Sequence, residues 1–206
     1  MDMFRLCRSD NMGLRSTAPS IMLRLDKVQE CYDFIKWWYT GTDGQYDWAD
    51  ASLPYLNIKD ADVFEPCDVF ISEFPDLGQG VALVLLKIKL LMDLQSLQEA
   101  SRSVGDNVPQ EILDMIREKA VGPAVSSRPE IMEQPDQSQN IAAMRKQKSN
   151  IHFWPALLNP ASHLVARPEY YSRGQESEMQ VTLKYSYASW AETPGAIDII
   201  RTLSKA

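Results

Sequence analysis

One nearly continuous apolar segment limits the folds that are open to this chain of 206 residues. From Leu77 to Ala100, apolar side chains recur with the period of an α-helix and occupy nearly all of its faces. A helix that is apolar on every side must be covered by other elements, so we expect it to be central and buried, with Asp76 as its N-cap. Nowhere does the alternation typical of a half-buried strand persist for more than a few residues. The sequence therefore predicts an all-α fold.

The other predicted helices form antiparallel hairpins, in an arrangement like an α-solenoid or a tetratricopeptide array. An apolar stripe from Leu14 to Leu25 is followed almost at once by a second stripe from Val28 to Tyr39, whereas residues 45–76 have no regular pattern. We expect one domain, with a helical body at 1–121 and C-terminal helices at 137–206 that pack on it. Residues 122–136 are rich in proline and polar residues, which predicts a mobile connection and the first site of limited proteolysis.

Charge and cysteine content exclude several classes of protein. The formal net charge of −7 argues against direct binding to nucleic acid or to an anionic membrane, for which a basic face is the usual footprint. The longest uncharged apolar run, Leu77 to Leu86, is shorter than the roughly 20 residues that cross a bilayer. Three widely spaced cysteines favour a reducing compartment, so we expect an intracellular protein, either cytoplasmic or nuclear.

No recognised motif supplies catalytic residues, metal ligands or a cofactor site. Cys31 lies on an apolar helical stripe and is expected to be a core residue rather than a reactive thiol. The histidines, His152 and His163, are expected to be structural, and with three scattered cysteines they do not form a zinc pattern. Gly78 and Gly80 lack the rest of a phosphate-binding loop, so we expect them to allow close packing at the start of a helix.

The acidic charge is concentrated in one part of the chain. Residues 26–76 hold 12 acidic and 3 basic residues, a net charge of −9, and they are rich in aromatic residues. Such a segment favours a protein partner with a basic surface. The candidate anchors for this partner are Trp37, Trp48, Tyr55, Asp47 and Asp50. The alternative, that the tryptophans are core and the acids only solvate the surface, remains open.

Helical spacing separates the two adjacent tryptophans of this segment. Trp38 continues the apolar row of Cys31 and Ile35, whereas Trp37 follows the polar Asp33 at four residues' distance. Adjacent residues of a helix point about 100° apart. We therefore expect Trp38 in the core and Trp37 at the rim.

Several short motifs give the chain a family resemblance. They are Asp10-Asn11-Met12-Gly13-Leu14-Arg15, Cys31 to Trp38, Tyr46-Asp47-Trp48, Ala61 to Pro66, Phe153 to Leu158 and Trp190 to Ala196. With these motifs the chain resembles an uncharacterised group of filamentous-fungal helical proteins of the tetratricopeptide type, some of which carry a MYND-type zinc finger. The chain lacks the cysteines of that finger and looks like a shortened member. The resemblance implies no known reaction.

The leading hypothesis is a non-enzymatic protein–protein interaction module. One alternative is an accessory protein or enzyme subunit that binds a small ligand between its helices. A second alternative is a regulatory protein that acts on chromatin through a partner, which depends on the zinc-finger association alone.

Overall fold

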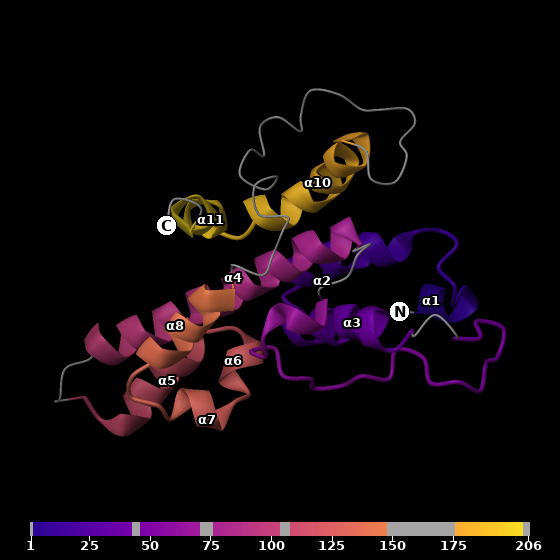
Figure 1. Cartoon of the computed structure of the whole chain (residues 1–206). Helices are drawn as coiled ribbons and strands as arrows, with labels where there is room; N and C mark the ends of the chain where they lie inside the picture. The colour runs from indigo at the N-terminus through magenta and orange to yellow at the C-terminus, as the bar shows by residue number, and fades with distance from the viewer. Residues whose placement is uncertain (1, 43–45, 71–75, 104–107, 148–175, 204–206) are drawn as a thin grey trace.

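The computed structural model describes residues 2–42, 46–70, 76–103, 108–147 and 176–203, which are mostly helical and contain no strand (Figure 1). The prediction of an all-α fold is confirmed. The helices are α1 (Asp2–Leu6), α2 (Ala18–Arg24), α3 (Val28–Thr40), α4 (Leu77–Ser103), α5 (Gln110–Ala120), α6 (Pro123–Ser126), α7 (Pro129–Met132), α8 (Ser138–Lys146), α10 (Glu176–Ala191) and α11 (Ala196–Leu203). The described residues also form two 3₁₀ turns, η1 (Leu14–Ser16) and η2 (Cys67–Phe70).

Helix α4 is the centre of the fold. It contacts α2 and α3 on one side, α10 and α11 on the other, and α5, α6 and α8 elsewhere along its length (Figure 1). Every residue from Val81 to Ile88 is buried, as expected for a helix that is apolar on all its faces. The prediction of a central, buried helix is therefore confirmed.

Close packing fixes the start of α4. The Asp76 carboxylate accepts a hydrogen bond from the backbone N–H of Gln79 (3.1 Å), which confirms the expected N-cap. At Gly78, a Cβ atom would lie 2.1 Å from the carbonyl oxygen of Ser16. This helix start can approach the η1 turn only because residue 78 has no side chain, as the sequence predicted.

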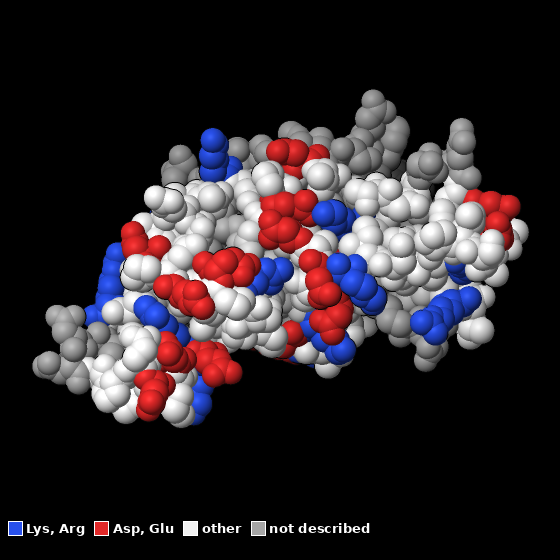
Figure 2. Space-filling model, turned by 90° about the horizontal axis from the view of Figure 1, so that it is seen from below, with Lys and Arg blue, Asp and Glu red and all other residues white. Residues whose placement is uncertain are grey.

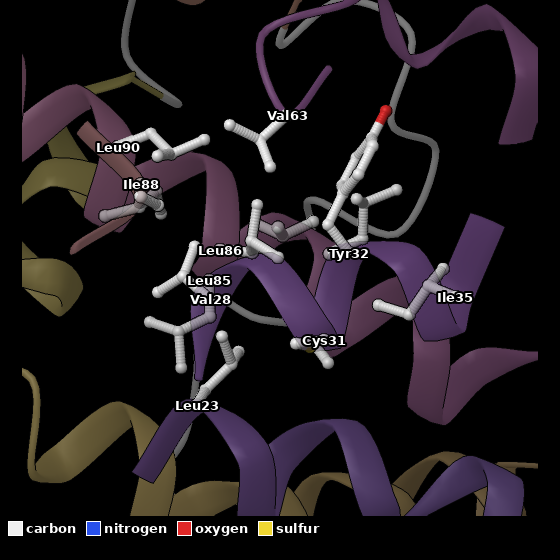
Figure 3. Packing of buried hydrophobic residues seen from close by; sticks show 14 of the residues in the cluster. Leu23, Val28, Cys31, Tyr32, Ile35, Val63, Leu85, Leu86, Ile88 and Leu90 are labelled. Carbon is white, nitrogen blue, oxygen red and sulfur yellow. The ribbon is translucent and has the colours of Figure 1, made fainter. Parts of the chain in front are cut away.

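The hairpin of α2 and α3 packs against α4 and supplies much of the core (Figure 3). Pro19 lies in the first turn of α2, where its missing N–H costs no helical hydrogen bond. Cys31 is fully buried, and its thiol donates to the carbonyl oxygen of Pro19 (3.5 Å), so the expected core role is confirmed. Burial raises the pKa of this thiol because it disfavours the thiolate.

The irregular segment 46–70 is attached to the helices by a buried lysine. The Lys87 ammonium of α4 donates to the carbonyl oxygens of Val63 (2.7 Å) and Glu65 (2.8 Å). The Glu65 carboxylate in turn accepts hydrogen bonds from Tyr32 (2.6 Å) and Lys36 (2.5 Å) of α3. Burial lowers the pKa of Lys87, because the charged ammonium is poorly solvated there.

Residues 122–136 differ from the expected connection. Pro123 and Pro129 each open a short helix, α6 and α7, because proline is well tolerated at the first position of a helix. Both helices place apolar side chains in the core, including Val125 and Ile131. The segment therefore buries more than its composition indicated, while its mobility stays a prediction. The sequence pattern also predicts a helix from about Gln137 to Phe153, and the part of it after Gln147 lies outside the described residues.

Candidate functional site

The aromatic residues predicted as partner anchors gather in one cluster. Trp37 lies 4.8 Å from Tyr55 and 6.5 Å from Trp48, measured between ring centroids, and Trp48 stacks on Trp38 at 5.7 Å. Tyr46 completes this aromatic cluster through contacts with Trp37 and Trp48. Segment 46–57 thus lies against α3 through ring contacts.

The prediction that Trp37 lies at the rim is wrong. Its side chain is 1% exposed, and its Nε1 donates to the Asn57 side chain (3.1 Å). Trp38 is 7% exposed, so it is a core residue as predicted. The apolar stripe on α3 correctly predicted one buried face of the helix. Segment 46–57 also covers the neighbouring face, which carries Trp37.

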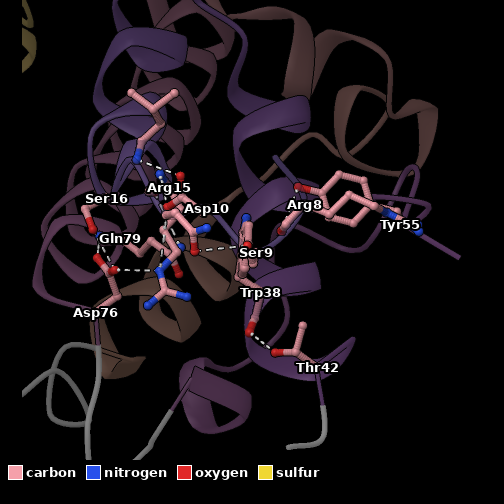
Figure 4. Close-up of polar contacts among 12 residues, drawn as sticks. Arg8, Ser9, Asp10, Arg15, Ser16, Trp38, Thr42, Tyr55, Asp76 and Gln79 are labelled. Carbon is pink, nitrogen blue, oxygen red and sulfur yellow. Dashed lines mark hydrogen bonds and ion pairs between the residues drawn. The ribbon is translucent and has the colours of Figure 1, made fainter. Parts of the chain in front are cut away.

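Arg8, which the sequence did not single out, holds this segment from the other side (Figure 4). Its guanidinium lies 4.7 Å from the centre of the Tyr55 ring and donates to the carbonyl oxygens of Asp50 and Leu53, each at 2.6 Å. Burial raises the pKa of Tyr55 to about 12. The contacts of the aromatic cluster and Arg8 therefore hold segment 46–57 against the helices and do not form an open binding surface.

The two predicted acidic anchors stabilise turns. The Asp47 carboxylate accepts the backbone N–H of Ala49 (2.9 Å). The Asp50 carboxylate accepts both the backbone N–H (2.8 Å) and the hydroxyl (2.6 Å) of Ser52, and these bonds lower the pKa of Asp50. Both residues thus have local structural roles, and their part in partner binding stays a prediction.

A groove of about 710 Å³ lies away from this cluster. It runs between α2 and the first half of α3, and the loop 56–60 and helix α6 form its other walls. One apolar wall comes from α2 and the residue that follows it, where Ala18, Ile21, Met22 and Leu25 follow one another at helical spacing. Ile21 is 50% exposed and Leu25 is 64% exposed, so this wall presents large apolar side chains to solvent.

A buried carboxylate positions the loop wall of the groove. Asp33 of α3 accepts the backbone N–H groups of Asp60 and Ala61, each at 3.0 Å, and a hydrogen bond from the Gln29 amide at 3.1 Å. Gln29 also accepts a hydrogen bond from Arg128 (2.9 Å), which follows α6. One polar network therefore connects α3, the loop and the α6 side of the groove.

Left-handed backbone conformations are concentrated along the groove. Among the described residues, four that are not glycine have a positive φ, and three of them line the groove: Asp26 (56°), Leu56 (47°) and Asp60 (53°). This conformation is unfavourable for a branched residue such as leucine, and strained residues often cluster at binding sites. The strain therefore supports a functional role for this part of the surface.

Helix α6 is held at the groove by a second carboxylate. Asp93 of α4 accepts the backbone N–H of Gly122 (3.1 Å), immediately before α6. Burial is the main cause that raises the pKa of Asp93 to about 6; the nearby Asp26 carboxylate acts in the same direction, while the Gly122 hydrogen bond and Lys89 act against it. Asp26 itself forms an ion pair with Lys89 (3.0 Å).

Acidic and basic groups line the rim of the groove together. The exposed pair of Lys27 and Glu30 (3.3 Å) lies at the start of α3, and Lys59 and Asp60 lie on the loop. Figure 2 shows acidic side chains gathered across the middle of the lower face of the molecule, with basic side chains among them. The groove is thus apolar inside and charged at its edge.

The described residues contain no arrangement of at least three histidine, cysteine, aspartate or glutamate side chains that could hold a metal ion. His152 and His163 lie outside them. Within the same ranges, no helix is both long and apolar enough to cross a membrane. The geometry of the groove suits the binding of apolar groups.

The sequence predicted the apolar stripe of α2 but did not indicate a groove. The stripe that contains Ile21 and Leu25 was visible, whereas nothing in it showed that these two side chains would remain uncovered. No family model matches the chain, and the comparisons with curated proteins and with solved structures give no match.

Proposed function

We propose that this chain is a non-enzymatic protein–protein interaction module of a tetratricopeptide-like kind, and that the groove binds an apolar segment of a partner protein. The observation that carries the proposal is the exposed apolar wall of α2, in particular Ile21 and Leu25. Apolar side chains that remain exposed beside a concave surface are typical of interaction sites. The strained backbone of Leu56, on the loop wall, is consistent with a surface that is selected for binding.

The test compares a groove variant with a matched control. Ile21→Glu combined with Leu25→Glu places two charges in the groove. Ile112→Glu with Met115→Glu makes the same change on α5, where the side chains are similarly exposed, at 48% and 57%. Each full-length protein, shown to be folded by circular dichroism, is used for affinity capture with quantitative mass spectrometry.

We expect the groove variant to lose specific partners that the wild type and the α5 control both retain. Partners retained by the groove variant, or lost only by the α5 control, would place the interaction elsewhere and contradict the proposal.

A small apolar ligand is the second candidate, because the volume of about 710 Å³ lies within the usual range for small-molecule sites. Native mass spectrometry of the purified chain separates the two candidates. A co-purifying small molecule that is absent from the groove variant would favour this second function.

A further inference from the structure

We infer that the partner segment is an amphipathic helix whose apolar face is flanked by lysine or arginine side chains. This inference rests on the proposed function of the groove. It adds the chemistry of the partner. Two features of the groove determine this chemistry: the spacing of its apolar side chains and the sign of its charge.

The spacing of the apolar residues fits a helical partner. The α2 wall presents side chains at positions 18, 21, 22 and 25, and α3 contributes Val28 and Phe34 to the same groove. A groove bordered by two helices accepts the apolar stripe of a third helix, which is recognised through anchors at i, i+3 or i+4, and i+7. The open groove receives these side chains, while the polar face of the helix stays in solvent.

The charge of the walls favours basic flanks. The lining holds four carboxylates, of Asp26, Glu30, Asp33 and Asp60, and two ammonium groups, of Lys27 and Lys59, so its formal net charge is 2 − 4 = −2. Counting Lys89 and Asp93, which lie beside Asp26, adds one charge of each sign, and counting Arg128, which donates to Gln29 of the lining, gives a net charge of −1, so the sign stays negative.

The α3 and loop walls also belong to the segment 26–76, whose net charge is −9, whereas the α2 and α6 walls lie outside it. An acidic partner is repelled by such a surface, and a basic partner is attracted and oriented by it.

Asp60 is the residue through which this preference can be tested. It lies at the edge of the groove, it is exposed, and it forms no ion pair with any described residue. Its backbone is left-handed (φ 53°), a conformation that asparagine also tolerates. Asp60→Asn therefore removes one charge without a steric change. Asp62→Asn is the matched control, because Asp62 is also exposed but does not line the groove.

The experiment selects peptides without assuming their charge. A displayed library of random 16-residue peptides is enriched on the full-length wild type, and peptides that still bind the double variant Ile21→Glu, Leu25→Glu are discarded. We expect the remaining peptides to be net positive, with large apolar residues at helical spacing. The Kd of the best peptide, measured by fluorescence anisotropy, should rise about two- to five-fold with Asp60→Asn and stay unchanged with Asp62→Asn.

Each of the other outcomes contradicts one part of the proposal. Groove-dependent peptides that are neutral or acidic, or a Kd that Asp60→Asn leaves unchanged, would refute the basic partner and leave the groove as a binding site. Apolar anchors without helical spacing would refute the helical partner. If no peptide depends on the groove, the proposed function fails together with this inference.

Discussion

Replacing Asp93 by asparagine should stabilise the protein at neutral pH. The Asp93 carboxylate is partly buried beside the groove, close to the Asp26 carboxylate, and it accepts the Gly122 N–H. Asparagine has nearly the same shape and keeps an oxygen that can accept this hydrogen bond. The substitution therefore removes a charge that burial disfavours while it preserves the contact with the start of α6.

The magnitude follows from the difference between the folded and unfolded pKa values. The folded pKa of Asp93 is about 6, against an ordinary value of about 3.9 for aspartate, and each pKa unit corresponds to about 1.36 kcal/mol. Between pH 4 and 6 the unfolded state loses this proton first, so the free energy of unfolding falls as the pH rises. Above pH 7 the full cost of about 3 kcal/mol applies, as an upper bound because the side chain is only partly buried.

Urea unfolding of the wild type and Asp93→Asn at pH 4.5, 6 and 7.5 measures this effect. We expect the smallest gain for the variant at pH 4.5, about a third of the full effect, and a gain that grows to about 1–3 kcal/mol at pH 7.5. Asp136→Asn is the control, because Asp136 is exposed and the Ser138 hydroxyl lowers its pKa, so no gain is expected. A gain that does not change with pH, or a loss at pH 7.5, would refute the account of this carboxylate.

Four further substitutions test the packing. Gly78→Ala should lower the free energy of unfolding by about 1–3 kcal/mol, measured by thermal unfolding, because the alanine Cβ would meet the Ser16 carbonyl. This loss is expected although alanine favours helices more than glycine does. A more stable variant would contradict the close approach of the two segments. Trp37→Ala and Trp38→Ala should each lower the free energy of unfolding by about 3–5 kcal/mol in denaturant melts. A clearly smaller loss for Trp37→Ala would indicate that Trp37 lies at the rim and would contradict its burial. Arg8→Lys should speed hydrogen exchange in segment 46–57, since lysine lacks the paired donors of the guanidinium; unchanged exchange would show that the charge alone suffices.

The parts of the fold that were predictable are those determined by local periodicity. The apolar pattern of α4 requires burial whatever its neighbours are, and Asp76 is a capping residue directly before that pattern. The position of segment 46–57 has no such local cause. It depends on contacts such as those of Arg8 with Asp50 and Leu53, which are more than 40 residues away in the chain.

The candidate site was harder to predict for a related reason. Periodicity shows that the α2 face with Ile21 and Leu25 is apolar, but it does not show what covers that face. The acidic residues 26–76 include the α3 and loop walls of the groove but not the α2 and α6 walls, and the aromatic residues there are mostly occupied in holding segment 46–57. Aromatic content alone does not distinguish an anchor from a packing residue.

Amide chemical-shift mapping tests the role of the groove most directly. The ¹⁵N-labelled full-length protein is titrated with the best peptide from the display selection, and the perturbed residues are located on the structure. We predict the largest shifts at residues 18–34, 56–60 and 122–127, which form the groove and its walls. Shifts centred on the exposed face of α5, or on Trp48 and Tyr55, would contradict the assignment of the groove as the binding site.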